Sequence, residues 1–74
     1  MTTNTKILQN IGRNIRKYRE QKGWSQEELA FECGLHRTYI GSIERGERNI
    51  TVLNLITIQN KLEVKISDLF PDEI

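Results

Sequence analysis

Apolar residues near the start of the chain recur at the spacing of one helical face, which predicts an amphipathic helix with this stripe in the core. The stripe consists of Ile7, Leu8, Ile11, Ile15 and Tyr18. Asn4 or Thr5 is a candidate N-cap, and Gly23 is a typical stop signal after Lys22. We therefore expect a first helix over residues 5–22.

A second, shorter helix is predicted by signals at both of its ends. Ser25 and Glu28 have the spacing of a capping box, in which each side chain binds a free backbone N–H at the helix start. Gly34 suits the left-handed conformation that closes many helices. These signals place the helix over residues 26–33.

A third helix is expected after a very short turn. His36 occupies the N-cap position, and Ile40 and Ile43 have the spacing of a buried pair. Gly46 then marks the end of the helical pattern. The predicted helix covers residues 37–44.

The remaining pattern predicts two more helices, over residues 52–62 and 66–70. Thr51 is a plausible N-cap for the first of them, and Pro71 prevents the second from continuing. No segment shows the alternating pattern of a strand. The sequence thus predicts an all-α fold, a compact bundle of five short helices in one domain of residues 1–74.

The fourth predicted helix carries more apolar residues than one face requires. Its expected core stripe consists of Val52, Leu55, Ile58 and Leu62. A second apolar set, offset from that stripe, consists of Leu53, Ile56, Ile66 and Ile74. Excess apolar surface usually marks an interface, and a chain this small gains stability from a partner. We therefore expect a symmetric homodimer formed through residues 52–74.

Cysteine content and hydropathy narrow the class of protein. Cys33 is the only cysteine, so an internal disulfide is impossible, and Cys33 with His36 gives too few ligands for a zinc site. No apolar run approaches the roughly 18 residues of a membrane span, and residues 1–10 lack the pattern of a secretory signal. We expect a cytoplasmic protein without a metal or other cofactor.

Charge is distributed unevenly, although the formal net charge is only +1. Residues 1–23 carry six basic residues and one acidic residue, whereas residues 24–35 carry three glutamates and no basic residue. Such a division favours one side that faces a polyanion. The alternative is an ordinary solvated helix surface.

The turn through Gly34 and Leu35 joins two short helices, the second of which is polar on its outward side. The polar residues there are Arg37, Thr38, Ser42 and Arg45. Such a helix can enter the major groove of DNA, where each base pair presents its own pattern of donors and acceptors. Residues 26–45 are therefore a candidate helix-turn-helix, although many helical hairpins share this pattern.

Several motifs taken together resemble one family. They are Gly23-Trp24-Ser25-Gln26-Glu27-Glu28-Leu29-Ala30, Gly34-Leu35, Tyr39-Ile40, Ile43-Glu44-Arg45-Gly46 and Leu62-Glu63-Val64. In these motifs the chain resembles the phage-repressor (Cro/XRE) helix-turn-helix family over about residues 8–70. The segments His36–Ile40 and Ile43–Asn49 are most similar to the controller proteins of restriction–modification systems.

The resemblance implies a lambda-repressor-like fold and a dimeric transcriptional regulator that binds a two-fold symmetric operator in double-stranded DNA. The matching positions imply base reading by Arg37, Thr38 and Ser42. They imply phosphate contacts by Gln26, Tyr39, Arg45, Arg48 and Asn49. His36 departs from the family pattern, which more often has Ser or Asp at this position, and it is a candidate phosphate donor in place of a strong cap. They also imply an ion pair between Arg16 and Glu44.

The sequence also allows functions other than that of a DNA-binding regulator. An antitoxin or phage-type repressor that also binds a protein partner is the main alternative, and the few residues after the last predicted helix argue against it. The acidic residues Glu27, Glu28 and Glu32 are candidates for contact with RNA polymerase, with a plain solvated face as the alternative. An enzyme is not expected, because no constellation of catalytic side chains is evident.

Overall fold

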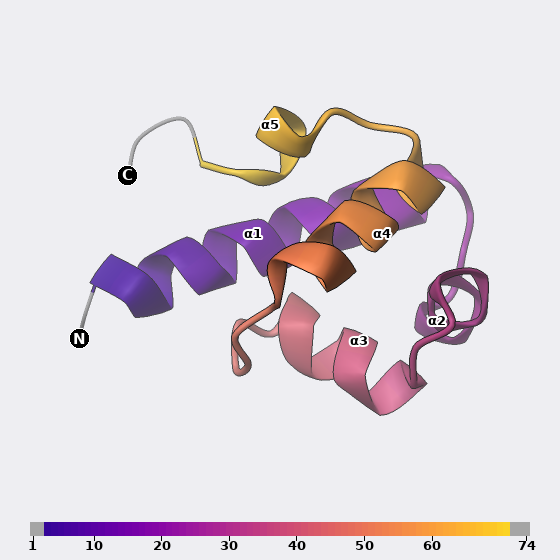
Figure 1. Cartoon of the computed structure of the whole chain (residues 1–74), viewed down its shortest axis with the longest axis horizontal. Helices are drawn as coiled ribbons and strands as arrows, with labels where there is room; N and C mark the ends of the chain where they lie inside the picture. Colours follow the sequence, from indigo (N-terminus) through magenta and orange to yellow (C-terminus); the bar gives the residue numbers. More distant parts are fainter. Residues whose placement is uncertain (1–2, 72–74) are drawn as a thin grey trace.

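The computed structural model describes residues 3–71, which contain five α-helices and no strand (Figure 1). The helices are α1 (Thr3–Gln21), α2 (Gln26–Cys33), α3 (Arg37–Glu44), α4 (Val52–Leu62) and α5 (Ile66–Leu69). The predicted all-α bundle is confirmed, and α2, α3 and α4 have the predicted bounds. α1 begins at Thr3, before both predicted caps, Asn4 and Thr5. Neither residue is the cap, because both have a helical backbone whereas an N-cap residue does not. α1 and α5 each end one residue earlier than predicted.

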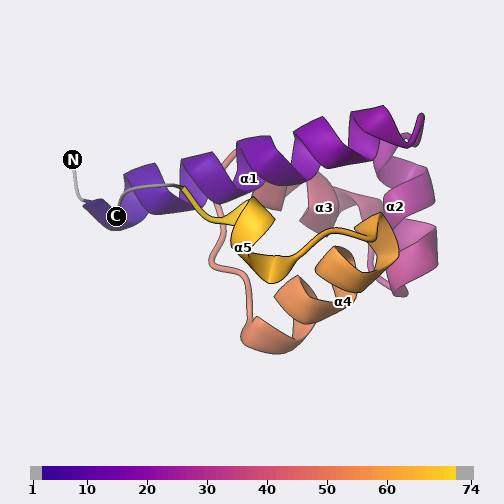
Figure 2. The ribbon, with the colours of Figure 1, turned by 90° about the horizontal axis from the view of Figure 1, so that it is seen from above.

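The longest helix, α1, forms one side of the molecule, and the four shorter helices lie against the other side of it (Figure 2). α1 contacts α3, α4 and α5, while α2 packs against α3 and α4. α2 and α3 therefore lie next to each other, and α4 lies beside α5. In Figure 1, α3 forms the lower edge of the molecule and α5 its upper edge.

All five helices meet in a single apolar core. Each helix contributes one large side chain with no exposed surface: Ile15, Leu29, Ile40, Ile58 and Leu69. Truncating a fully buried Leu or Ile to Ala typically costs about 2–5 kcal/mol. The helices around the candidate helix-turn-helix are therefore held in place by a core shared with every other element.

α1 and α3 approach each other closely at Gly12. A Cβ atom on Gly12 would lie only 2.3 Å from the carbonyl oxygen of Ile43 and 2.6 Å from that of Glu44. Both oxygens belong to the backbone at the end of α3, so they cannot move aside alone. The absence of a side chain at Gly12 thus lets α1 fix the position of α3.

The turn between α2 and α3 follows from the predicted caps. The backbone N–H of Glu28 donates to the Ser25 hydroxyl at 3.0 Å, and that of Ser25 donates to the Glu28 carboxylate at 2.8 Å. At the other end of α2, Gly34 has φ +68°, and the N–H of Leu35 donates to the carbonyl of Ala30 at 2.9 Å. The predicted capping box at the start of α2 and the predicted left-handed closure at Gly34 are both confirmed.

Val52 departs from the predicted core stripe of α4. Leu55, Ile58 and Leu62 are buried, but the Val52 side chain is 71% exposed. Val52 is the first residue of α4, where the helix has not yet reached the core, and Ile50 in the preceding loop packs there instead. The prediction was wrong for this residue, and Val52 belongs to the exposed apolar set described below.

Candidate nucleic-acid interface

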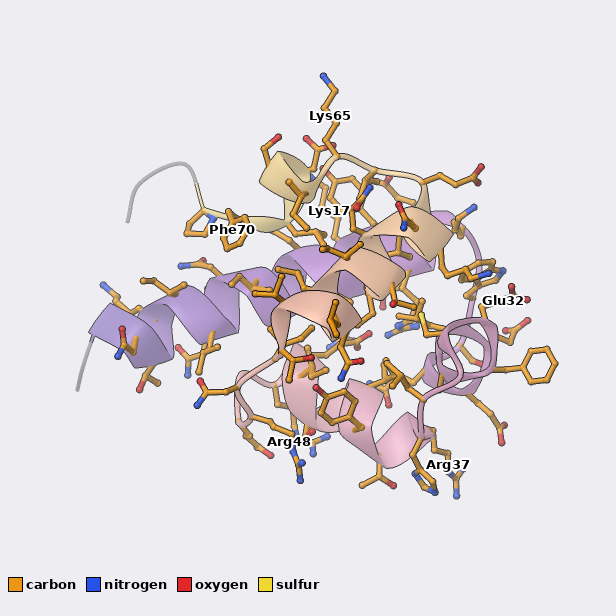
Figure 3. All side chains as sticks on the ribbon, in the orientation of Figure 1. Lys17, Glu32, Arg37, Arg48, Lys65 and Phe70 are labelled. Atoms are coloured by element: carbon orange, nitrogen blue, oxygen red, sulfur yellow. The ribbon has the colours of Figure 1, made fainter. Side chains whose placement is uncertain are left out.

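The outer side of α3 carries polar side chains beside the start of α2. Arg37, Thr38 and Arg45 are exposed, and together with Gln26 and Gly41 they line a shallow hollow. Figure 3 shows Arg37 at the edge of the molecule that α3 forms. Because Gly41 has no side chain, the hollow reaches the backbone of α3 between these longer groups.

Two further predicted residues of this region take part in local hydrogen bonds. His36 caps α3, since its Nδ1 accepts from the backbone N–H of Thr38 at 3.1 Å. A neutral imidazole that accepts at Nδ1 carries its hydrogen on Nε2, which stays available as a donor. Ser42 is half-buried, and its hydroxyl donates to the carbonyl of Tyr39 at 2.8 Å. The hydroxyl proton of Ser42 is therefore engaged within α3.

The predicted phosphate contacts at the end of α3 gather around the loop 46–51. The Arg48 guanidinium lies over the Tyr39 ring, 5.4 Å from its centre, at the edge of the molecule next to α3 (Figure 3). Arg45 Nε lies 3.1 Å from Glu47 Oε1, and both side chains are exposed, so this ion pair is weak. Asn49 is exposed in the same loop.

Asn54 joins this group, although no pattern in the sequence predicted a role for it. Its side-chain Nδ2 donates to the hydroxyl of Tyr39 at 3.0 Å. The two residues belong to different helices, α4 and α3. Only the packing of those helices brings them together, so no local spacing could have revealed the contact.

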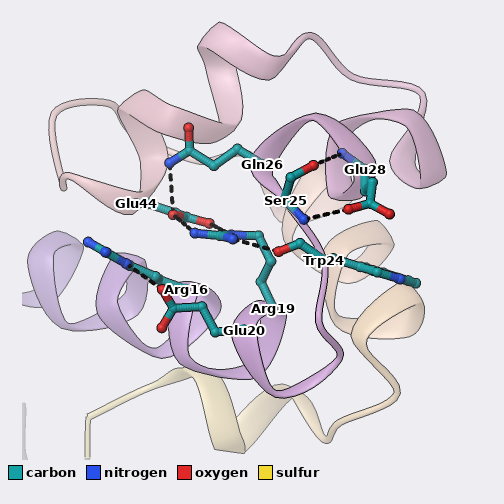
Figure 4. A network of polar contacts seen from close by, with 8 residues as sticks. All are labelled: Arg16, Arg19, Glu20, Trp24, Ser25, Gln26, Glu28 and Glu44. Carbon is teal, nitrogen blue, oxygen red and sulfur yellow. Dashed lines mark hydrogen bonds and ion pairs between the residues drawn. The ribbon is translucent and has the colours of Figure 1, made fainter.

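A buried polar network holds α3 against α1 and α2 (Figure 4). Arg19 binds both carboxylate oxygens of Glu44, at 2.7 and 3.0 Å, and also donates to the carbonyl of Trp24 at 2.7 Å. Gln26 Nε2 donates to the same carboxylate at 3.0 Å. Arg19 and Glu44 are each 8% exposed, and the hydrogen bond to Glu44 raises the pKa of Arg19. The network thus fixes both the end of α3 and the side chain that opens α2.

The expected pairing of Arg16 with Glu44 is wrong. Arg16 instead binds Glu20 at 3.2 Å on the surface of α1. The helical period explains the difference, since Arg19 continues the steps of four from Ile11 and Ile15 and so lies on the face of α1 that is turned to the core. This signal was present in the sequence, because a charged residue on an apolar stripe requires a buried partner.

The helices α4 and α5 also carry exposed apolar side chains. Leu53 is 77% exposed, and Val52, Ile56 and Ile66 are exposed as well. We call these four residues the α4–α5 apolar surface. Of the predicted dimer residues, Leu53, Ile56 and Ile66 lie on it, and Ile74 lies outside the described residues.

The outer face of α2 combines an exposed aromatic ring with acidic residues. Phe31 is 82% exposed, and it lines a shallow hollow together with Trp24, Glu27, Glu28 and Glu32. The sequence contained a signal for the exposure of Phe31, because this residue does not share the core-facing side of α2 with the buried residues of that helix. Among residues 3–71, neither Glu27 nor Glu32 forms an ion pair.

Residues 3–71 also bear on whether the chain could be a membrane protein, a metalloprotein or a thiol enzyme. No helix there is long and apolar enough to cross a membrane, and no three potential ligands gather in a way that could hold a metal ion. Cys33 is half-buried against the core. Burial raises the pKa of its thiol, which disfavours the reactive thiolate.

Comparison with protein families matches residues 15–69 to the family described as helix-turn-helix. Among curated proteins, the chain is similar to the control protein C.BamHI of Bacillus amyloliquefaciens. The two are 49% identical over 70 residues, which cover 93% of this chain and 84% of the relative.

Two solved structures are similar as well. The restriction–modification controller protein C.AhdI from Aeromonas hydrophila has a TM-score of 0.82 at 41% identity, over 85% of this chain and 96% of that one. The biofilm regulator SinR, solved in complex with DNA, has a TM-score of 0.76 at 37% identity, over 80% of this chain and 95% of that one. The family match over residues 15–69 includes the whole candidate helix-turn-helix at residues 26–45.

Proposed function

The chain belongs to the helix-turn-helix family of transcriptional regulators, and from this premise we propose that it is the controller protein of a restriction–modification system. It binds a two-fold symmetric operator in double-stranded DNA as a homodimer, in the cytoplasm, and it performs no catalytic step. One observation carries the proposal: α3 exposes Arg37 and Thr38 while the network of Arg19, Glu44 and Gln26 braces α3 from behind. A single domain contains both α3, which we call the reading helix, and the dimer surface.

Base reading is assigned to the exposed residues at the start of α3. Arginine binds guanine through two hydrogen bonds in the major groove, and the methyl group of threonine can contact that of thymine. Arg37 and Thr38 are adjacent and exposed, so they can address neighbouring base pairs. Ser42 offers an acceptor one turn further along, because its own proton is used within the helix.

Phosphate binding is assigned to the residues that border the reading helix. The group consists of Gln26, His36, Tyr39, Arg45, Arg48 and Asn49. Gln26 keeps one N–H free beyond the bond to Glu44, and it stands at the start of α2, where free backbone N–H groups favour an anion. These contacts fix the register on the duplex, whereas the base contacts specify sequence.

Dimerisation is assigned to the α4–α5 apolar surface, with Leu53, Ile56 and Ile66 at its centre and Ile74 joining from the end of the chain. Four of the five large apolar residues exposed within residues 3–71 lie there. A two-fold axis through this surface would set the two α3 helices about one DNA turn, roughly 34 Å, apart. The antitoxin alternative has no comparable support, because the relatives reported above are regulators by name.

A footprint on the DNA upstream of the protein's own gene tests the proposal. We expect protection of a symmetric site whose half-sites are centred about one helical turn apart. Binding should weaken steeply with salt, because phosphate contacts release counterions. No protection even at low salt, with the protein folded, would overturn the proposed function.

We propose RNA polymerase as a further partner, at the outer face of α2. Glu27, Glu28 and Glu32 repel phosphate but complement a basic protein surface, and the exposed ring of Phe31 among them offers an apolar anchor. Replacing Glu27 and Glu32 by Gln should lower transcription activated from the operator without lowering operator affinity. The matched control is Glu20→Gln on α1, and unchanged transcription in the α2 variant would reject this partner.

A further inference from the structure

The contact between Asn54 and Tyr39 links α4 to the reading helix. Asn54 Nδ2 donates to the Tyr39 hydroxyl oxygen at 3.0 Å, and both side chains are half-buried. Asn54 is itself held in the first turn of α4, where its backbone N–H donates to the Thr51 hydroxyl at 3.1 Å. The amide group therefore approaches Tyr39 from an anchored position.

The Tyr39 ring is confined from other directions as well. It packs against the edge of the core, and the Arg48 guanidinium lies over it. A confined ring leaves the hydroxyl hydrogen as the main remaining freedom of the side chain, because a hydroxyl rotates to suit its partners.

Donor and acceptor chemistry decides where that hydrogen points. A tyrosine hydroxyl has one hydrogen to donate and two lone pairs to accept with, whereas an amide NH₂ group can only donate. Asn54 thus occupies a lone pair of the Tyr39 oxygen and leaves the hydrogen for another acceptor. Among residues 3–71 no hydrogen bond uses that hydrogen.

We propose that Asn54 is a positioning residue for DNA binding, which fixes the Tyr39 hydroxyl so that its hydrogen is donated to a phosphate oxygen of the operator. The inference rests on the proposed function. It adds that the helix carrying Leu53 and Ile56, at the dimer surface, also prepares a DNA contact in the neighbouring helix. The hydrogen bond is arranged before DNA arrives, so less freedom is lost on binding.

Reversing the polarity of this hydrogen bond tests the proposal. Asn54→Asp keeps the size of the side chain but replaces the donor by a carboxylate, which accepts the Tyr39 hydrogen and withdraws it from DNA. We would measure operator affinity by fluorescence anisotropy for the wild type, Asn54→Asp, Tyr39→Phe and the double variant. Added charge near DNA weakens binding with or without the Tyr39 hydroxyl, so the double variant separates that repulsion from the loss of the hydrogen bond.

We expect Tyr39→Phe alone to weaken operator binding about tenfold, the size of one charge-assisted hydrogen bond. Asn54→Asp should weaken binding about tenfold more in the wild-type background than in the Tyr39→Phe background. Asn60→Asp, which adds the same charge to an exposed position of α4, is the matched control and should show no such dependence. Thermal unfolding of each variant verifies that it is folded.

Two results would overturn the inference while leaving the proposed function intact. One is an equal loss from Asn54→Asp in both backgrounds, which would mean that charge alone acts. The other is full operator affinity in Tyr39→Phe, which would mean that its hydroxyl donates nothing to DNA. Failure of the wild type to bind any duplex would instead count against the proposed function itself.

Discussion

The α2–α3 end of the molecule and its α4–α5 end expose surfaces of opposite chemistry. At the α2–α3 end the exposed groups are polar apart from Phe31, and a buried ion pair between Arg19 and Glu44 lies beneath them. At the α4–α5 end the exposed groups include Val52, Leu53 and Ile56, with apolar side chains that find no cover within the described chain. Both ends pack on the same core, so they differ in the contacts that their exposed surfaces lack.

This difference indicates a division of labour. The polar end is complete in one chain, because its bracing contacts come from α1, α2 and α3 of the same molecule. The apolar end gains free energy only when another surface removes it from water, at about 25 cal/mol per Å² of apolar area. Substitutions at the polar end should therefore lower the stability of the fold and the recognition of DNA. Substitutions at the apolar end should instead weaken dimer assembly.

The largest effect is expected from Arg19→Met. It leaves the Glu44 carboxylate buried without its partner, which should lower the free energy of unfolding by about 3–5 kcal/mol. The control Arg16→Met breaks an exposed ion pair on the same helix and should cost less than about 1 kcal/mol. Chemical unfolding measures both, and equal losses would refute the structural role of the buried pair.

The double variant Arg19→Met with Glu44→Leu sharpens this result. Removing both charges should recover much of the lost stability, since apolar replacements of a buried ion pair are often well tolerated. Operator affinity should stay low, because Gln26 then has no carboxylate to hold it. Recovery of both properties would mean that the network stabilises the fold without positioning Gln26.

At the apolar end, Leu53→Glu should separate the dimer. A charge in a buried interface is costly, and we expect the dimer dissociation constant to rise at least about thirtyfold, equivalent to about 2 kcal/mol. Sedimentation measures this, and operator affinity should fall with it. Phe31→Glu is the matched control, because Phe31 is equally exposed on α2 and should leave sedimentation unchanged. If Leu53→Glu still sediments as the wild type does, the interface lies elsewhere.

At the polar end, Arg37→Ala should act on DNA sequence rather than on folding. We expect a loss of about 1–3 kcal/mol on the operator and relaxed discrimination at one base pair. On random duplex DNA the loss of binding free energy should be smaller, because there Arg37 contributes no more than a single phosphate contact does. Arg13→Ala, at an exposed position of α1, is the control. Equal losses on operator and random DNA would reject base reading by Arg37.

The sequence predicted the elements of this fold better than their contacts. Caps and glycines are local signals, so Ser25 with Glu28, and Gly34, set the ends of α2 correctly. Contacts between helices depend on packing. The family pattern suggested Arg16 as the ion-pair partner of Glu44, whereas the helical period indicates Arg19, which is the partner in the structure.

Two further features could not be predicted because they depend on where helices cross. The bond from Asn54 to Tyr39 requires the packing of α4 beside α3. The exposure of Val52 depends on how far α4 extends beyond the core. Residue types and the helical period thus indicated the chemistry proposed for the candidate site and the place of Arg19, whereas contacts at helix crossings could not be predicted.

The smallest effect is expected at a contact between the residue that follows α1 and the residue that follows α4. Lys22 Nζ donates to the Glu63 carboxylate at 2.6 Å, and this hydrogen bond lowers the pKa of Glu63. A carboxylate with a lowered pKa in the folded state stabilises the fold above its ordinary pKa of 4.5. That contribution is lost as the pH falls through the lower, folded value.

Glu63→Gln should therefore be slightly less stable than the wild type near neutral pH, and the difference should shrink in acid below about pH 4.5. Chemical unfolding at both pH values measures it, with Glu47→Gln as a control, since Glu47 is also exposed and paired, with Arg45. The effect is small because the Glu63 side chain is exposed and salt screens the pair. A difference that grew in acid would contradict the ionic origin of this link.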